Sequence, residues 1–336
     1  MIKVLYAGSP EASAKTLEYL IDNSTQNGFE IVGVLTNPPT AKGRHKELIP
    51  TPVALMAKQK GIREDFIYSF EHLDQNAREQ VIKSNADILV CFAYGHIFGP
   101  KFLSMFKYGG INLHPSLLPK YRGCTPVNAA ILNRDETTAI TIQTVSLKMD
   151  EGDILSQKII NLNFTETATS LLETSALEGA KLITQILSKI NTENVLPIGT
   201  KQIGEASYTS IIKKGDAKID FSQSVNSIDA TVRAYYLEPG AFCFDSNNNS
   251  IKILSCVPCT FENIKSLNSS VTQEEIEEYI NLPCGKVLKF DKPTGIWVKA
   301  ADGIICIKSL QKQGKNVMSY KDFINGSRDF VGSVLT

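Results

Sequence analysis

The first 190 residues alternate short apolar runs with segments of helical periodicity, and this alternation constrains the fold more than any other feature. Near-continuous apolar runs occur at KVLYAG (3–8), IVGVLT (31–36), ADILVCFA (86–93) and GGINLHP (109–115). Runs of this kind are typical of strands that are buried on both faces of a parallel sheet. Helical patterns lie between them, so right-handed crossovers are expected to connect the strands. We therefore predict an α/β fold with an open, mostly parallel, Rossmann-like sheet.

The pattern changes after the first 190 residues. Further strands are predicted at 138–148 and 153–162, and a long amphipathic helix at about 170–190 closes the first domain. Residues 191–206 are polar and helix-breaking, as in a linker. From 207 to 336 short strands alternate with Gly, Asn and Asp turns, which predicts a smaller, OB-like antiparallel β-barrel. We thus expect domains at 1–190 and 207–336 joined by a linker at 191–206.

Length, charge balance and hydropathy restrict the class of protein to which this chain can belong. A length of 336 residues favours about two domains. The 35 basic and 35 acidic side chains cancel, whereas proteins dominated by nucleic-acid binding usually carry a basic excess. A local basic surface remains compatible with brief RNA contact. The N-terminus resembles a strand rather than a signal peptide, and no apolar run reaches the length of a membrane span. We expect a cytoplasmic protein.

The seven cysteines favour a reducing compartment over a disulfide framework. Cys256 and Cys259 have the C-x-x-C spacing of a zinc knuckle, but Cys284 and Cys306 stand alone in strand-like runs. A closed zinc site needs four ligands that come together. We interpret these cysteines as small buried hydrophobic residues, and we predict no metal site.

The stretch INLHPSLLPKYRG (111–123) carries two polar side chains at the end of a predicted strand. In an open parallel sheet, ligands bind beyond the carboxyl ends of the strands. Asn112 and His114 are two residues apart, so both side chains face the same small volume. An amide donor beside an imidazole suits stabilisation of an oxyanion and proton transfer near neutral pH. An ordinary hydrogen-bonded Asn and His at a strand end is the alternative.

A second polar segment, KMDEGDIL (148–155), places Asp150 in a turn between two predicted strands. A carboxylate against His114 would raise the pKa of the imidazole and fix its orientation. A plain surface turn is the alternative, because Asp and Gly favour turns. Near the N-terminus, AGSP (7–10) lacks the G-x-G-x-x-G of dinucleotide sites, and Ser9 is expected to cap the first helix.

Taken together, these segments resemble the 10-formyltetrahydrofolate-dependent formyltransferases, over essentially the whole chain. N-x-H followed directly by SLLPKYRG, and M-D-x-G-D at 149–153, carry the resemblance. AGSP, TNPPTAKGRHKELIPTPV (36–53), YTSIIKKGDAKIDF (208–221) and RAYYLEPGAF (233–242) extend it. The likeness is strongest to the members that act on methionyl-tRNA. It implies 10-formyltetrahydrofolate as co-substrate, initiator methionyl-tRNA as partner, a role in translation initiation, and a monomer.

The resemblance also implies a role for each matching residue. Asn112 would bind the formyl oxygen, His114 would stabilise the oxyanion and shuttle protons, and Asp150 would keep His114 protonated. The folate would lie against the backbone of 92–95 and 147–152, with Phe92 and Ile97 offering an apolar face. The full set of expected folate-binding residues is Phe92, Ala93, Tyr94, Gly95, Ile97, Ser116, Leu117, Leu118, Pro119, Leu147, Met149 and Gly152. The expected tRNA-binding residues are Lys42, Arg44, His45, Lys46, Lys312 and Lys315.

This chain departs from the family pattern at several positions. Thr40 and Glu47 stand where basic residues are usual, Lys42 is an addition, and Glu151 follows Asp150. A basic series that includes Lys299, Lys308, Lys312 and Lys315 near the C-terminus could follow an RNA backbone or be ordinary solvated lysines. Two enzymatic alternatives remain, a formyltransferase for a nucleotide-linked amino sugar and a formyltetrahydrofolate hydrolase. A catalytically silent RNA-binding relative is the non-enzymatic alternative.

Overall fold

The computed structural model describes residues 1–42 and 47–336, which form two compact units. Unit 1 comprises Met1–Pro126, Thr137–Asn161 and Ser170–Ser210. Unit 2 comprises Val127–Glu136, Leu162–Thr169 and Ile211–Thr336. The whole segment expected to be a linker (191–206) therefore belongs to unit 1, while two short stretches that precede α6 or begin it belong to unit 2.

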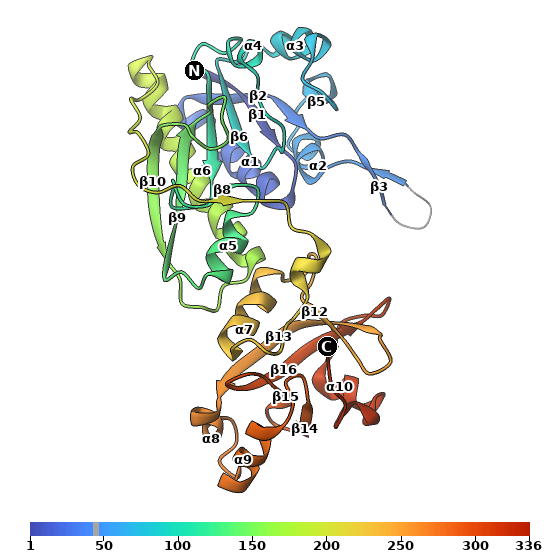
Figure 1. Cartoon of the computed structure of the whole chain (residues 1–336). Helices are drawn as coiled ribbons and strands as arrows, with labels where there is room; N and C mark the ends of the chain where they lie inside the picture. The colour runs from blue at the N-terminus through green and yellow to red at the C-terminus, as the bar shows by residue number, and fades with distance from the viewer. Residues whose placement is uncertain (43–46) are drawn as a thin grey trace. The chain divides into compact units, whose positions relative to one another are not determined.

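Unit 1 is built on a seven-stranded sheet with the order β10-β9-β7-β6-β1-β2-β5 (Figure 1). The strands are β1 (Ile2–Gly8), β2 (Phe29–Thr36), β5 (Ile67–Ser69), β6 (Ile88–Phe92), β7 (Gly110–His114), β9 (Thr137–Thr144) and β10 (Ile154–Asn161). Pairing is parallel from β5 to β7 and antiparallel between β7, β9 and β10. The predicted open, mostly parallel sheet is confirmed.

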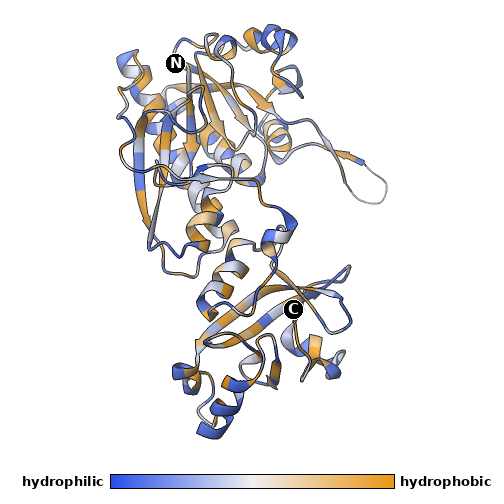
Figure 2. Ribbon diagram, viewed as in Figure 1, coloured by the Kyte–Doolittle hydropathy of each residue, from blue (hydrophilic) through white to orange (hydrophobic). Residues whose placement is uncertain are grey.

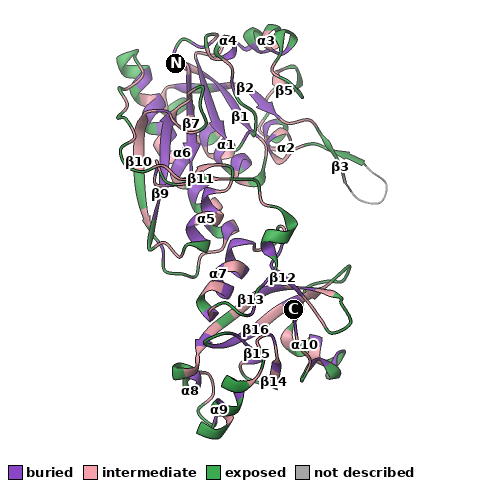
Figure 3. Ribbon diagram, in the orientation of Figure 1, coloured by how far each residue is buried: buried purple, intermediate pink, exposed green. Residues whose placement is uncertain are grey.

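Helices cover both faces of this sheet because its strands are apolar on both sides. Along β1, Val4 and Tyr6 pack into one core and Leu5 and Ala7 into another. The first core receives α1 (Glu11–Asn23), α2 (Pro52–Gln59) and α6 (Ala168–Glu193), and the second receives α3 (Gln75–Val81) and α4 (Pro100–Leu103). The central strands are apolar in Figure 2 and buried in Figure 3. Burial of each large apolar side chain contributes about 1.5–3 kcal/mol.

The loop after β1 does not cap α1 as expected. Pro10 is the N-cap residue, and no side chain accepts a hydrogen bond there. Ser9 Oγ instead accepts a hydrogen bond from the backbone N–H of Asn37 at 3.1 Å and lies 3.3 Å from Thr36 Oγ1. The serine therefore ties the loop after β1 to the loop after β2.

Short elements complete unit 1. A hairpin of β3 (Thr40–Lys42) and β4 (Glu47–Ile49) extends from β2, and its exposed arms are visible in Figure 3. Farther along the chain, β8 (Arg122–Gly123) pairs in parallel with β11 (Tyr208–Thr209). This pairing fixes the segment after α6 beside the loop that follows β7.

Unit 2 contains six antiparallel strands around an apolar core. The order is β12-β13-β16-β15-β14, with β17 paired to β16. The strands are β12 (Phe242–Phe244), β13 (Ser250–Thr260), β14 (Val287–Asp291), β15 (Gly295–Lys299), β16 (Gly303–Lys312) and β17 (Met318–Ser319). The helices are α5 (Pro126–Leu132), α7 (Val225–Ala234), α8 (Ile264–Leu267), α9 (Gln273–Asn281) and α10 (Tyr320–Asn325).

The last residues of the chain connect the two outer strands of this sheet. Ser333 accepts a hydrogen bond from Val287 N at 2.9 Å, and Leu335 N donates to Gly285 O at 2.9 Å. Thr336 and Phe244 exchange backbone hydrogen bonds of 2.8 and 3.0 Å. The C-terminal tail therefore joins β14 to β12 and completes the predicted barrel.

Candidate functional site

The strand alternation predicted from the sequence holds at the end of β7. Ile111 and Leu113 lie in the core with α1 and α6, so Asn112 and His114 project from the opposite face. In the antiparallel pairing with β9, Asn112 lies opposite Gln143 and His114 lies opposite Thr141. Four polar side chains are thus grouped on one face of two neighbouring strands.

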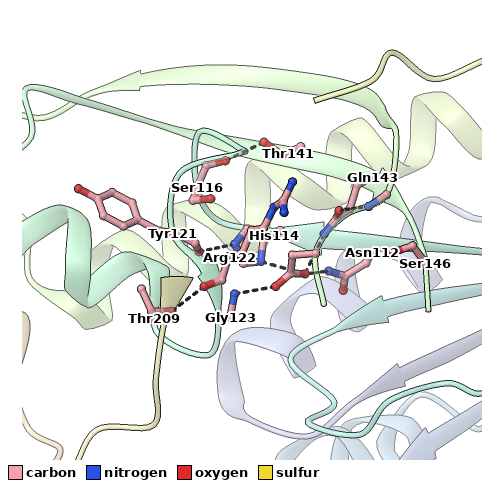
Figure 4. Close-up of polar contacts among 12 residues, drawn as sticks. Asn112, His114, Ser116, Tyr121, Arg122, Gly123, Thr141, Gln143, Ser146 and Thr209 are labelled. Atoms are coloured by element: carbon pink, nitrogen blue, oxygen red, sulfur yellow. Dashed lines mark hydrogen bonds and ion pairs between the residues drawn. The ribbon is translucent and has the colours of Figure 1, made fainter. Parts of the chain in front are cut away.

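Asp150 contacts both polar side chains of β7, Asn112 and His114, which are labelled in Figure 4. Its Oδ1 lies 3.5 Å from His114 Nδ1 and 3.4 Å from Asn112 Nδ2. Its Oδ2 accepts a hydrogen bond of 2.8 Å from the backbone N–H of Gly123. The side chains of His114 and Asp150 are only 5% and 12% exposed. The structure therefore brings the three expected catalytic residues together in a largely water-excluded position.

Gln143 is a site residue that sequence reasoning missed. Its Nε2 donates to Asp150 Oδ1 at 2.8 Å, and its Oε1 accepts from Gly152 N at 3.1 Å. The side chain is buried, at 1% exposure. The alternation of β9 placed Gln143 on one face, but only the register opposite Asn112 shows that this face is the site.

Gln202, in the segment after α6, was also missed. Its Nε2 donates to the carbonyls of Asp150 and Gly152, both at 2.8 Å. Its Oε1 accepts from Arg122 Nε and Nη2 at 3.1 and 2.8 Å. Arg122 also lies 3.1 Å from a carboxylate oxygen of Glu151, one of the residues at which this chain departs from the family pattern. The turn between β9 and β10 that contains Asp150 (the Asp150 turn) is therefore held by hydrogen bonds from both Gln143 and Gln202.

Burial dominates the electrostatics of His114. The Nε2 atom lies 2.9 Å from the carbonyl oxygen of Tyr121 and must donate to it, which leaves Nδ1 facing Asp150. Burial lowers the pKa of His114, and the nearby Asp150 carboxylate and the Tyr121 carbonyl oppose this effect without reversing it. The expectation of a raised pKa is therefore wrong in net direction, because desolvation of the cation outweighs its attraction to the carboxylate.

The loops around this site expose both backbone and apolar side chains. Ala93 and Gly95, with φ of 52° and 88°, present an exposed turn after β6. Ile97, Leu147 and Met149 are 68%, 59% and 50% exposed. Such exposed apolar side chains beside polar loop backbone suit a flat, partly polar ligand.

Other members of the expected folate set are not accessible through their side chains. Phe92 and Tyr94 are 2% and 1% exposed and pack in the two cores of unit 1. The expectation that Phe92 offers an apolar face is wrong, because that side chain points into the α1–α6 core. Ser116 is fully buried and donates to the carbonyl of Lys120 at 2.6 Å, and Leu118 is 4% exposed.

Three members of the expected folate set remain. Leu117 and Pro119 are half-buried, and Gly152 is buried. A Cβ at Gly152 would lie 1.7 Å from the carbonyl oxygen of Thr144. Gly152 therefore shapes the turn through close backbone packing.

The expected tRNA-binding residues are only partly described. Lys42 ends β3, and Arg44, His45 and Lys46 lie outside the described residues. In unit 2, Lys315 is exposed. Lys312 is half-buried, donates to Ser327 Oγ at 2.5 Å and lines a cavity of about 260 Å³. Lys299 is 5% exposed, so it does not belong to a surface basic series.

The cysteines are free thiols, and Cys259 and Cys306 are buried as expected, whereas Cys256 and Cys284 are only half-buried. Within residues 1–42 and 47–336, no group of three or more His, Cys, Asp or Glu side chains is arranged to hold a metal ion. In that same part of the chain, no helix is long and apolar enough to cross a membrane.

Known protein families match both halves of the chain. The family models "Formyl transferase" and "Formyl transferase, C-terminal domain" match residues 2–187 and 211–328. A methionyl-tRNA formyltransferase of Treponema denticola is 39% identical over 336 residues, covering 98% of each chain.

Two solved structures share the fold. WlaRD, a sugar 3N-formyl transferase, has a TM-score of 0.59 at 20% identity, covering 94% of this chain and 99% of its own. The methionyl-tRNA formyltransferase of Clostridium thermocellum has a TM-score of 0.54 at 15% identity, covering 77% and 94%. On the family models and the relative from Treponema denticola, the chain belongs to the formyl transferase family.

Proposed function

We propose that this protein transfers the formyl group of 10-formyltetrahydrofolate to the α-amine of initiator methionyl-tRNA, the formylation that precedes translation initiation. The convergence of Asn112, His114 and Asp150 at the end of β7 carries the proposal. Full-length relatives named methionyl-tRNA formyltransferase support the choice of acceptor.

The folate donor supplies the formyl group. The reaction replaces the bond from the formyl carbon to N10 by a bond to the amine nitrogen, and a proton passes from the amine to N10. Asn112 Nδ2 donates to the formyl oxygen as negative charge develops there. Its 3.4 Å contact with Asp150 is long, so this amide remains available to a ligand.

His114 accepts the proton that the attacking amine loses. Its lowered pKa keeps the imidazole neutral near pH 7, and its Nε2 is engaged with the carbonyl of Tyr121. Nδ1 is therefore the basic atom. Asp150, 3.5 Å away, stabilises the imidazolium that forms, so the carboxylate acts on the charged state of His114 during the reaction.

We propose that the folate binds between the turn after β6 and the turn before β10. The backbone of Ala93 and Gly95 pairs with the polar edge of the pterin. The exposed side chains of Ile97, Leu147 and Met149 cover its apolar face. The Phe92 side chain has no part in this contact.

Unit 2 is proposed to hold the tRNA, with the exposed Lys315 among the phosphate contacts. Lys312 is less accessible because its ammonium group is engaged with Ser327. A monomeric state and a cytoplasmic location complete the proposal.

The test compares three acceptors for the same folate donor, namely charged initiator tRNA, a nucleotide-linked amino sugar and water. We expect formylmethionyl-tRNA as the main product. Preferred formylation of the sugar would retain the chemistry and reject the acceptor. Release of formate alone would favour the hydrolase, and no reaction with any acceptor would reject the proposal.

A further inference from the structure

We infer that Gln143 is a positioning residue, which orients the Asp150 carboxylate for proton transfer and forms, with Gln202, a relay of hydrogen bonds to Arg122. The inference rests on the proposed function. It assigns a role to two glutamines that the motif-based expectations did not include.

The contact between Gln143 and Asp150 is the shortest at the catalytic oxygen. Gln143 Nε2 lies 2.8 Å from Oδ1, whereas Asn112 Nδ2 and His114 Nδ1 lie at 3.4 and 3.5 Å. Gln143 Oε1 also accepts from Gly152 N at 3.1 Å. One buried amide therefore holds both the carboxylate and the backbone two residues beyond it.

The orientation of the Gln143 amide is determined by its partners. The carboxylate requires a donor and the Gly152 N–H requires an acceptor, so a flipped amide would place its carbonyl oxygen against Asp150. Gln202 continues this series of hydrogen bonds, and again the amide nitrogen donates and the amide oxygen accepts. Its Nε2 donates to the carbonyls of Asp150 and Gly152, and its Oε1 accepts from Arg122.

The turn needs such support because of its backbone conformation. Asp150 has a φ of 53°, which lies in the left-handed region that residues other than glycine rarely adopt. Strained residues of this kind persist only where the surrounding contacts hold them. Two glutamines on different segments contact the carboxylate, the carbonyl of Asp150, and both the N–H and the carbonyl of Gly152.

The chemical consequence concerns the charged form of Asp150. A hydrogen bond donated to a carboxylate favours its ionised state. Loss of the Gln143 donor would remove this preference for the ionised form of Asp150. It would also let the carboxylate turn away from His114. A misplacement of about 1 Å at a reacting group costs about 100-fold in rate.

The test measures the pH dependence of kcat for formylmethionyl-tRNA formation in wild type, Gln143→Met and Gln143→Glu. Gln143→Met should lose about 100-fold in kcat with KM values changed by less than about 2-fold, and its rate relative to wild type should fall further as pH is lowered. In Gln143→Glu a proton shared between two carboxylates restores a donor at low pH. Its relative rate should therefore rise as pH is lowered.

Gln157→Met is the matched control. Gln157 is half-buried on the neighbouring strand β10, and its amide donates to Thr141 Oγ1 at 2.8 Å instead of to Asp150. Its kcat should stay within about 2-fold of wild type, because no contact to the Asp150 turn is lost. Gln202→Met, in the segment after α6, provides a second variant if Gln143→Met fails to fold, and it should also lower kcat with little change in KM.

The outcomes separate this inference from the proposed function. If wild type forms formylmethionyl-tRNA and the two Gln143 variants match Gln157→Met in kcat and pH profile, the positioning role is rejected and the function stands. Equal pH trends for the Met and Glu variants would indicate a purely structural role and also reject it. If wild type forms no formylated product, both fail together.

Discussion

At the scale of single residues, the Asp150 carboxylate is surrounded by polar groups from three different segments of unit 1. His114 and Asn112 come from β7, Gln143 comes from β9, and Gly123 comes from the loop after β7. Asn112, Gln143 and Gly123 donate hydrogen bonds from different directions, and His114 Nδ1 lies against Oδ1. The position of the carboxylate is therefore determined before any substrate binds.

Replacement of Asp150 by Asn should lower kcat by about 10²–10⁴-fold, the usual contribution of a proton-transfer group. Folate affinity should change little, because the folate contacts proposed above are backbone and apolar groups. Single-turnover formylation and a separate folate titration measure the two quantities. Asp153→Asn is the control, since this aspartate in the same turn pairs with Lys201 and not with His114. Turnover near wild type in the Asp150 variant would remove that residue from the mechanism.

The buried His114 should make stability depend on pH. Its pKa is lowered in the folded protein, so the unfolded chain binds the proton more readily. The free energy of unfolding should therefore be fully retained above about pH 6.5, the ordinary value for histidine, and decrease as pH falls toward the pKa of the folded state. Urea unfolding of wild type and His114→Gln at several pH values measures this. Identical pH dependence in the two proteins would show that His114 is not desolvated.

The sequence was sufficient to predict that the polar residues of β7 share a face, because alternation along a strand does not depend on tertiary contacts. Asn112 and His114 had to share a face once the strand was recognised. Gln143 and Gln202 could not be found in this way, since their roles depend on strand register and on where the segment after α6 lies. The direction of the His114 pKa was missed because it depends on burial in the folded protein.

At the scale of elements, the turn between β9 and β10 depends on the absence of a side chain at Gly152. An Ala there would place Cβ 1.7 Å from the carbonyl oxygen of Thr144, so the two strands would have to separate locally. Gly152→Ala should cost about 3 kcal/mol of unfolding free energy, the upper end of the usual overpacking range, and should also lower kcat. Chemical denaturation and the formylation rate check both effects.

Gly215→Ala is the matched control for that substitution. No heavy atom of the described residues lies within 4 Å of the position that its Cβ would occupy, and its φ is not positive. Its stability should stay within about 0.5 kcal/mol of wild type. Equal effects at the two glycines would contradict the close packing of the Asp150 turn.

The C-terminal tail should contribute substantially to the stability of unit 2. Leu335 is 2% exposed in its core and lies between the hydrogen bonds that join the tail to Gly285 and Phe244. Leu335→Ala should cost about 2–5 kcal/mol, and hydrogen exchange at the Phe244 and Val287 amides should accelerate. Val331→Ala, at a position 37% exposed, is the control and should have a small effect. Unchanged exchange in the Leu335 variant would contradict closure of the barrel by the tail.

The elements themselves were largely predictable, because apolar runs and helical periodicity are local signals. The long helix near 170–190 and the strands of the main sheet other than β5 lie close to the predicted positions, whereas β5 and the short strands β3, β4, β8 and β11 were not predicted. The role of the C-terminal tail was not predictable, since its short sequence lacks the alternation that would predict a strand and does not show which strands it pairs with. The segment at 191–206 likewise reads as a linker until its pairing with the site is seen.

At the scale of the whole molecule, the proposed function needs unit 1 to perform the chemistry and unit 2 to hold the tRNA. If Lys315 contacts a tRNA phosphate, Lys315→Ala should weaken tRNA binding and reduce the slope of log affinity against log salt by about 1. Binding measured at several salt concentrations tests this, with Lys101→Ala, an exposed lysine of unit 1, as control. An unchanged slope for Lys315→Ala would exclude that contact.

The most direct test of the central claim is single-turnover formation of formylmethionyl-tRNA by wild type and by a variant that combines Asn112→Ala, His114→Ala and Asp150→Asn. The account predicts formylated product from wild type and a rate lower by at least about 10⁴-fold from the combined variant, with tRNA binding retained. Equal rates of product formation in the two proteins would contradict it and remove these three residues from the mechanism. No product from wild type despite tRNA binding would also contradict it and would favour a catalytically silent RNA-binding protein.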